Sequence, residues 1–134
     1  MSVEFADSNI LIYLVSADER KANVAQQILD RRPVISVQVL NETANVLVNK
    51  LRKPWAETLE FLASVRSQSQ VVALDERTHD AGVRIAARHR LHVHDSMIVA
   101  SALLAGCDTL YSEDMHHGLV VENRLTIVNP FLAA

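Results

Sequence analysis

The sequence is poor in cysteine, glycine, proline and aromatic residues, and neither sign of charge dominates it. Its single cysteine, Cys107, excludes an intrachain disulfide and fits a reducing compartment. With 3 glycines and 3 prolines in 134 residues, the chain does not resemble a disordered or low-complexity sequence. The aromatic residues, 4% of the total, form no periodic platform for stacking single-stranded bases. The net charge of −3 argues against a broad, charge-driven coating of nucleic acid.

Long apolar runs are also missing. The longest nearly apolar stretch, residues 97–107, is far shorter than the roughly 20 residues that a membrane span needs. The first residues lack the basic region and the apolar segment of a signal peptide. We therefore expect a cytoplasmic protein. At 134 residues, 49% of them hydrophobic, we expect one domain over residues 1–134.

Short apolar segments alternate with helical patterns along the chain. We expect strands at residues 3–6, 33–36, 71–74, 109–111 and 125–128. Helices are expected from a capping box at Ser16 to about residue 30, from Ser36 to about 51, at 55–66, from Asp75 to about 89, and from Asp95 to about 105. This alternation is typical of a parallel sheet with helices on both faces, a three-layer α/β fold.

Four acids lie beside or inside the apolar segments. Asp7 follows the first strand and Asp114 follows the fourth. Asp95 opens the most apolar helix, and Glu42 lies on the polar side of the helix after the second strand. Because ligands of parallel sheets bind outside the carboxyl ends of strands, Asp7 and Asp114 could share a cation. Carboxylates about 5 Å apart repel by about 3 kcal/mol at an effective dielectric near 20. Several ionised carboxylates in one place would therefore need a positively charged group or ion beside them.

A hard divalent cation, Mg²⁺ or Mn²⁺, is the ion that such oxygen ligands favour. A water-bearing site of this kind usually handles phosphate esters. Each acid also has a purely structural interpretation: Asp7 or Asp95 could cap the segment that follows it, and Glu42 could lie on a solvated helix face. The acid after the fourth strand is ambiguous, because Glu113 lies beside Asp114.

The ordered set of motifs resembles the PIN-domain nuclease family. The residues Asp7-Ser8-Asn9-Ile10-Leu11 after a strand are similar to its opening DxN motif, and Glu42 lies where the family has a helical acid. His94-Asp95-Ser96, followed by MIVASAL, resembles its D-(A/S)-x-I-x-A helix, and Ser112-Glu113-Asp114 resembles its (T/S)-x-D element. The segment from LYSEDMHHG to RLTIVNPF resembles the bacterial toxin branch known as VapC.

The resemblance implies a PIN-like fold with five parallel strands in the order 3-2-1-4-5. It also implies a Mg²⁺- or Mn²⁺-dependent endoribonuclease, the toxin of a type II toxin–antitoxin pair. Such a toxin is a homodimer whose site is blocked by a cognate antitoxin protein. The catalytic acids that the resemblance implies are Asp7, Glu42, Asp95 and Asp114.

The same resemblance assigns roles within this set. Asp7 and Asp95 would bind the metal directly, and the other two acids would complete the pocket by holding metal-bound waters or a second ion. Asn9 and Ser112 would orient the carboxylates.

Basic residues and histidines lie close to two of the acids in sequence. Arg88 and Arg90, in the densest basic stretch, could grip RNA phosphates or could belong to an ordinary solvated helix end. Histidines at 92, 94, 116 and 117 suggest zinc, but no cysteine cluster or H-E-x-x-H helix accompanies them, and we disfavour that ion.

Other functions stay open. A metal-dependent phosphatase of small phosphate esters would also place acids at strand ends. Phosphatases of the aspartyl-phosphate type have a second aspartate two residues after the nucleophile, where this chain has Asn9, and this difference disfavours them. A PIN nuclease of RNA processing and a non-catalytic module that binds a protein partner are the remaining alternatives.

Overall fold

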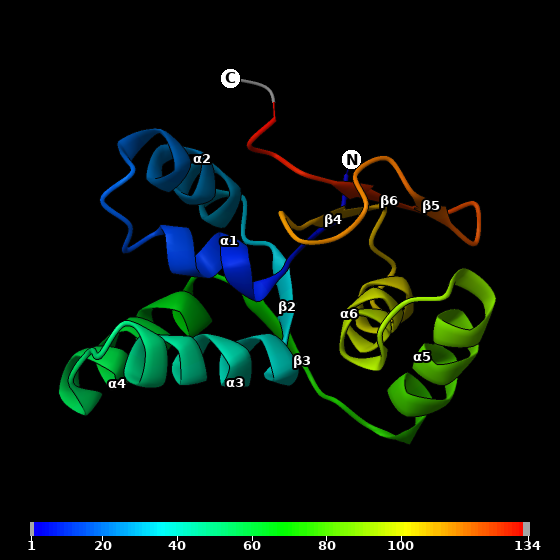
Figure 1. Ribbon diagram of the computed structural model, residues 1–134, viewed down its shortest axis with the longest axis horizontal. Coiled ribbons are helices and arrows are strands. Elements are labelled where there is room, and N and C mark those ends of the chain that lie inside the picture. The colour runs from blue at the N-terminus through cyan, green and yellow to red at the C-terminus, as the bar shows by residue number, and fades with distance from the viewer. Residues whose placement is uncertain (1, 133–134) are drawn as a thin grey trace.

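Short apolar strands and the helices between them form a layered α/β fold in the computed structural model, which describes residues 2–132 (Figure 1). The elements are β1 (Glu4–Ala6), α1 (Ser8–Tyr13), α2 (Glu19–Asp30), β2 (Val34–Ser36), α3 (Val37–Asn45), the π-helix η1 (Val46–Lys50), α4 (Trp55–Ser67), β3 (Gln70–Val72), α5 (Glu76–His89), α6 (Val93–Leu104), β4 (Thr109–Tyr111), β5 (Val120–Val121) and β6 (Leu125–Val128). Figure 1 shows α1 to α4 on one side of the sheet and α5 and α6 on the other. The predicted three-layer α/β class is confirmed.

Within residues 2–132, the sheet has six strands in the order β3-β2-β1-β4-β6-β5. The first five in this order pair in parallel, and they are the five predicted strands in the predicted order. The prediction of a five-stranded, wholly parallel sheet is wrong at one edge, where β5 pairs antiparallel with β6. A strand of two residues is too short to show the alternation by which strands are recognised in a sequence.

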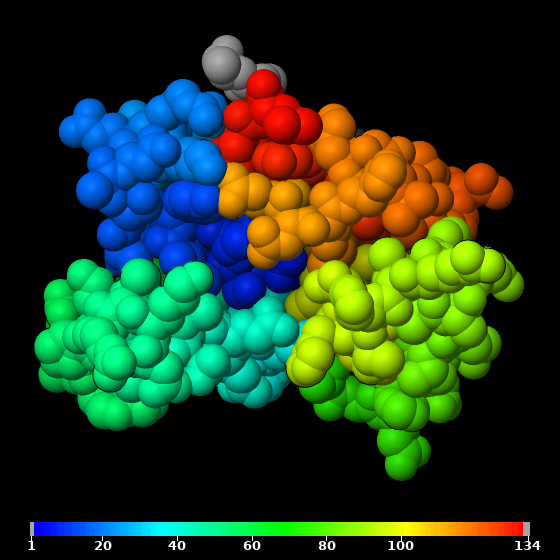
Figure 2. Space-filling model, viewed as in Figure 1, coloured from blue at the N-terminus to red at the C-terminus, as the bar shows by residue number. Residues whose placement is uncertain are grey.

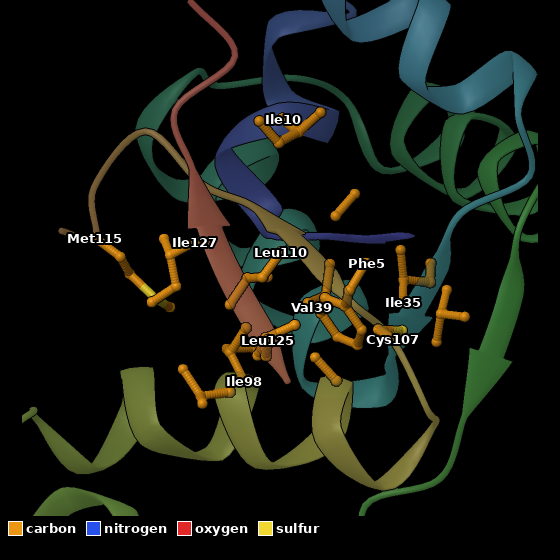
Figure 3. Close-up of a cluster of buried hydrophobic side chains, with 14 of the residues drawn as sticks. Phe5, Ile10, Ile35, Val39, Ile98, Cys107, Leu110, Met115, Leu125 and Ile127 are labelled. Atoms are coloured by element: carbon orange, nitrogen blue, oxygen red, sulfur yellow. The ribbon is translucent and has the colours of Figure 1, made fainter. Parts of the chain in front are cut away.

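Side chains from neighbouring strands fill the centre of the molecule. Phe5, Ile35, Leu110 and Ile127, one from each of β1, β2, β4 and β6, are fully buried. Burial of each such side chain stabilises the fold by about 1.5–3 kcal/mol. Figure 3 shows α1 and α6 on opposite sides of these strands, so the strands are apolar because both of their faces are covered.

Helix starts were predicted at the capping residues Ser16, Ser36, Asp75 and Asp95. Asp75 caps α5 as predicted, whereas the start of α2 differs. Asp18, not Ser16, caps α2, because the Asp18 carboxylate accepts a hydrogen bond from Lys21 N at 3.2 Å. The Ser16 hydroxyl accepts from Asp18 N at 3.0 Å and shapes the preceding turn. Ser36 caps α3 as predicted. Among residues 2–132, no helix is both long enough and apolar enough to cross a membrane.

Candidate active site

The carboxyl ends of β1 and β4 meet at one edge of the sheet. Parallel pairing aligns Ala6 with Tyr111, and Asp7 N donates to the Tyr111 carbonyl at 3.0 Å. The chain leaves both strands at this point, into α1 and into the turn that contains Ser112 and Asp114. Side chains that lie more than a hundred positions apart in sequence therefore come within hydrogen-bonding distance.

Asp7 is the most buried of the four acids, with 5% of its surface exposed. One carboxylate oxygen accepts from Ser8 N at 2.7 Å, so Asp7 caps α1, and the other accepts from the Ser112 hydroxyl at 2.9 Å. Burial raises the pKa of Asp7 to about 6; its two hydrogen bonds oppose this shift, and the nearby charges of Glu42 and Asp95 add to it. Asp7 is thus a helix cap and also a destabilised charge that a cation would stabilise.

Asn9 joins the two strand ends. Its amide Nδ2 lies 3.4 Å from Asp7 Oδ2, 3.3 Å from Ser112 Oγ and 3.3 Å from Asp114 Oδ2. Its oxygen accepts a hydrogen bond from Glu113 N at 3.0 Å. Since an amide group has two N–H bonds for three acceptors, these contacts are shared, and Asn9 acts as the common donor of the cluster.

Glu42 reaches the same edge from α3. Its carboxylate accepts from the Ser8 hydroxyl and from Gln38 Nε2, both at 3.1 Å. Gln38 is buried and also donates to the carbonyl of His94 at 3.0 Å, which ties α3 to the start of α6. Glu42 is half-buried, so it does not lie on a freely solvated helix face.

Asp95 is the third residue of α6, and His92 is the N-cap. The expectation that Asp95 opens or caps this helix is therefore wrong, since the helix already begins at Val93 and the His92 carbonyl accepts from Ser96 N. An acid in a first turn interacts favourably with the positive end of the helix dipole. Burial raises the pKa of Asp95; the charge of Glu42 adds to the shift, and His92 opposes it.

The four segments that contribute these acids meet on one face of the molecule. Figure 2 shows the starts of α1, α3 and α6 and the turn after β4 gathered there, in dark blue, cyan, yellow-green and orange. We call Asp7, Glu42, Asp95 and Asp114 the acidic cluster. Hydrogen bonds through Asn9 and Ser8 link three of its members, and Asp95 is linked to the others by its electrostatic influence.

The chemistry of this donor set fits a hard divalent cation. Burial and the neighbouring charges raise the pKa values of Asp7 and Asp95, so a shared positive charge would stabilise their ionised carboxylates, and Mg²⁺ and Mn²⁺ prefer oxygen ligands. Within residues 2–132, however, no three acidic, histidine or cysteine side chains lie close enough together to hold one ion. An ion in this arrangement would bind at most two of these carboxylates at once, with water in its remaining positions.

The predicted RNA-contacting arginines lie apart from this network. Arg88 Nη1 is 3.9 Å from Glu122 Oε1, and Arg90 ends α5 with a left-handed backbone, φ 56°. In the part of the chain that the structure describes, no hydrogen bond or ion pair joins either arginine to the acidic cluster. Their contact with RNA stays a prediction.

The sequence analysis did not identify Ser8 and Gln38 as partners of Glu42. A signal for both was present: Ser8 lies inside the DxN motif, and Gln38 precedes Glu42 by four residues, a spacing that puts both on one helix face. Neither position indicates on its own which side chain of another helix it will contact.

Comparison with known proteins identifies the family. The family described as PIN domain matches residues 5–119, a range that includes the whole acidic cluster. This chain belongs to the PIN domain family. A comparison with curated protein sequences finds no match.

Solved structures share the PIN fold at low sequence identity. A toxin–antitoxin complex from Klebsiella pneumoniae matches with a TM-score of 0.69 and 21% identity, over 97% of this chain and 98% of the other. A DNA-bound VapBC from Salmonella typhimurium matches with a TM-score of 0.70 and 17% identity, over 95% and 97%. VapC20 of Mycobacterium tuberculosis, a sarcin–ricin loop cleaving toxin, matches with a TM-score of 0.65 and 18% identity, over 83% and 89%. Similarity at these identities concerns the fold alone.

Proposed function

We propose that this PIN domain is a metal-dependent endoribonuclease and the toxin of a type II toxin–antitoxin pair. The observation that carries the proposal is the buried Asp7 carboxylate, whose pKa is raised to about 6 at the point where four chain segments bring acids together. A fold seldom buries charge in this way without a functional partner for it.

Asp7 and Asp95 would hold Mg²⁺ or Mn²⁺, with Glu42 and Asp114 holding metal-bound water or a second ion. When bound, such an ion activates a water and stabilises negative charge on phosphodiester oxygens. The chain itself orients the ligands: Ser8 N holds one oxygen of Asp7, and the Ser112 hydroxyl holds the other. The oxygen held by Ser8 N keeps a second lone pair for a ligand, whereas the oxygen held by Ser112 also receives the Asn9 amide.

Asn9 bridges the Asp7 and Asp114 carboxylates. It donates to both from one amide group, which no carboxylate at this position could do without adding repulsion. This donor role also disfavours the phosphatase alternative, in which a second acid would occupy position 9.

The biological role is inferred from the neighbours in fold. The Klebsiella structure is a toxin–antitoxin complex, the Salmonella structure is a DNA-bound VapBC, and VapC20 is described as a toxin that cleaves the sarcin–ricin loop. We infer that this chain likewise forms a homodimer, that a cognate antitoxin protein blocks its acidic cluster, and that its substrate is RNA in the cytoplasm.

Cleavage of RNA oligomers by the purified protein is the direct experiment. We expect cleavage with Mg²⁺ or Mn²⁺, none with EDTA, and none with Asp7→Asn in either condition. Turnover of a generic phosphomonoester, without RNA cleavage, would favour the phosphatase instead. Growth arrest on expression, absent with Asp7→Asn, would distinguish a toxin from a nuclease of RNA processing.

A further inference from the structure

Glu113 lies next to Asp114 in sequence, but its side chain contacts other elements. One carboxylate oxygen accepts from the Tyr13 hydroxyl at 2.5 Å, and the other accepts from Lys21 Nζ at 2.6 Å. Lys21 Nζ also donates to the Tyr13 oxygen at 3.0 Å, so the three side chains form a closed triangle. Tyr13 ends α1 and Lys21 lies in the first turn of α2, so the turn after β4 is fastened to both helices.

Lys21 occupies a position that a lysine does not favour. The N-terminal end of a helix carries partial positive charge and repels a cation. Here the ammonium group is compensated by Glu113 and by two aromatic rings, with Nζ 4.6 Å from the centre of Tyr13 and 5.3 Å from that of Phe131. The Tyr13 and Phe131 rings pack edge to face at 4.8 Å, which supports the triangle.

Within the triangle, Glu113 is ionised and Lys21 is protonated. Burial alone would raise the pKa of Glu113, but the hydrogen bonds from Lys21 and Tyr13 outweigh it and lower the pKa. The hydrogen bond to Glu113 in turn raises the pKa of Lys21. Both groups are therefore charged at neutral pH, and the pair is a fixed link rather than a titrating one.

The backbone of Glu113 is fastened from the opposite side. Its N–H donates to Asn9 Oδ1 at 3.0 Å, and the next N–H, of Asp114, lies 3.3 Å from Ser112 Oγ. The Asp114 side chain itself is exposed and receives one described hydrogen bond, from Asn9 Nδ2. Its position therefore depends on the turn much more than on its own packing.

We propose that Glu113 is a positioning residue: gripped by Lys21 and Tyr13, it fixes the turn at residues 112–114 and so sets where the Asp114 carboxylate lies. Glu113 is not a metal ligand in this assignment, because both of its oxygens are already engaged on the side of α1 and α2. The effect of Glu113 on catalysis rests on the proposed function, whereas its effect on the turn does not.

The variants Lys21→Met and Glu113→Gln remove the charge pair, and the double variant Lys21→Glu with Glu113→Lys reverses it. A matched control exists in Arg31→Met, since Arg31 Nε pairs with Glu4 at 2.8 Å and Tyr111 also donates to that carboxylate. Arg31 Nη2 also lies 3.3 Å from the Tyr111 hydroxyl, so this second triangle joins β1, β4 and the end of α2, and its side-chain hydrogen bonds do not involve residues 112–114. A general effect of losing one ion pair would appear in the control too.

Backbone hydrogen exchange measures directly how firmly the turn at residues 112–114 is held. We expect the amides of Glu113 and Asp114 to exchange about tenfold faster in both single variants, to recover in the charge-reversed protein, and to be unchanged in Arg31→Met. Unchanged exchange in the single variants, or an equal change in the control, would overturn the proposal.

Metal affinity and kinetics test whether a loosened turn at residues 112–114 affects the acidic cluster. We expect Mn²⁺ binding, measured by calorimetry, to weaken about three- to tenfold in the single variants, with kcat lowered by a similar factor and KM for RNA unchanged. A rise in KM alone would contradict positioning of Asp114. If the wild-type protein neither binds Mn²⁺ nor cleaves RNA while the two amides still respond, the proposed function fails and the positioning role stands.

Discussion

Asn9 Nδ2 lies 3.3 Å from the carboxylate of Asp114, although 105 positions separate the two residues in sequence. The contact exists because β1 and β4 are adjacent and parallel, so the chain leaves both strands at the same edge. An amide donor between two carboxylates reduces their repulsion without neutralising either of them. Asn9 should therefore be needed for the geometry of the acidic cluster, although it is not one of its acids.

Asn9→Asp tests this role, because it keeps the size of the side chain and replaces the donor by a further negative charge. We expect kcat for RNA to fall about 10- to 100-fold and Mn²⁺ affinity to change with it, as found when groups that orient metal ligands are replaced. Asn23→Asp, at an exposed position of α2, is the control and should have wild-type kinetics. Wild-type kinetics in Asn9→Asp would remove Asn9 from the site.

The raised pKa of Asp7 predicts how stability depends on pH. Folding raises this pKa from 3.8 to about 6, so the folded protein binds the proton more tightly than the unfolded chain does. The resulting stabilisation is complete below pH 3.8 and is lost as the pH rises through about 6. Above that pH the ionised carboxylate destabilises the metal-free fold by an amount on the order of 3 kcal/mol.

Asp7→Asn removes this titration and should show the difference directly. We expect the metal-free variant to be more stable than the wild type at pH 7.5, by up to about 3 kcal/mol, and the gain to disappear toward pH 4. Urea denaturation at a series of pH values in EDTA measures it. A variant that is less stable than the wild type at pH 7.5 would show that lost hydrogen bonds outweigh the buried charge.

Added metal should offset most of this difference in stability. A cation that binds only the folded protein stabilises it by about 2.7 kcal/mol at a concentration one hundred times its Kd, which raises the Tm by several degrees. We expect this shift with Mn²⁺ in the wild type and in Asp80→Asn, an exposed position of α5, but not in Asp7→Asn. An equal shift in all three proteins would indicate binding outside the acidic cluster.

Apolar patterning was sufficient to predict the five parallel strands, because each contains a short, nearly continuous apolar run, even in β3, which lies at the edge of the sheet and is largely exposed. Strand β5 was not predicted, since Val120 and Val121 make a strand only by pairing with β6. The start of α2 was misplaced for a related reason: Ser16 and Asp18 can both cap a helix, and sequence alone does not say which of them meets a free N–H.

The candidate site could likewise be predicted only in part. The order of the acids along the chain predicts which strand ends and helices carry them, but not which side chains of other elements they contact. Ser8 meets Glu42 because α1 and α3 pack side by side, which depends on how both helices lie on the sheet. The direction of Glu113, toward Lys21 rather than the acidic cluster, is likewise a property of the turn and of α2 together.

Gly82 of α5 allows this helix to approach α6 closely, near the turn that carries Asp95. A Cβ atom at Gly82 would lie 2.5 Å from Met97 Sδ and 2.7 Å from its Cε. The thioether is the flexible end of its side chain and can rotate away. In Gly82→Ala the gain in helix propensity, about 1 kcal/mol, should therefore largely offset the strain of moving it.

A double-mutant cycle separates the two effects. Met97→Ala alone should destabilise the protein by less than the roughly 2–5 kcal/mol of a fully buried methionine, since Met97 is half-buried, and by at least about 1 kcal/mol less again in the Gly82→Ala background, where the added methyl group fills part of the space. The control cycle pairs Met97→Ala with Ala87→Gly, an exposed position of the same helix, and should be additive within about 0.5 kcal/mol. Additivity at Gly82 as well would mean that α5 and α6 pack less closely there than the contact distances indicate. In that case α5 would not hold the start of α6, and with it Asp95, in a fixed position.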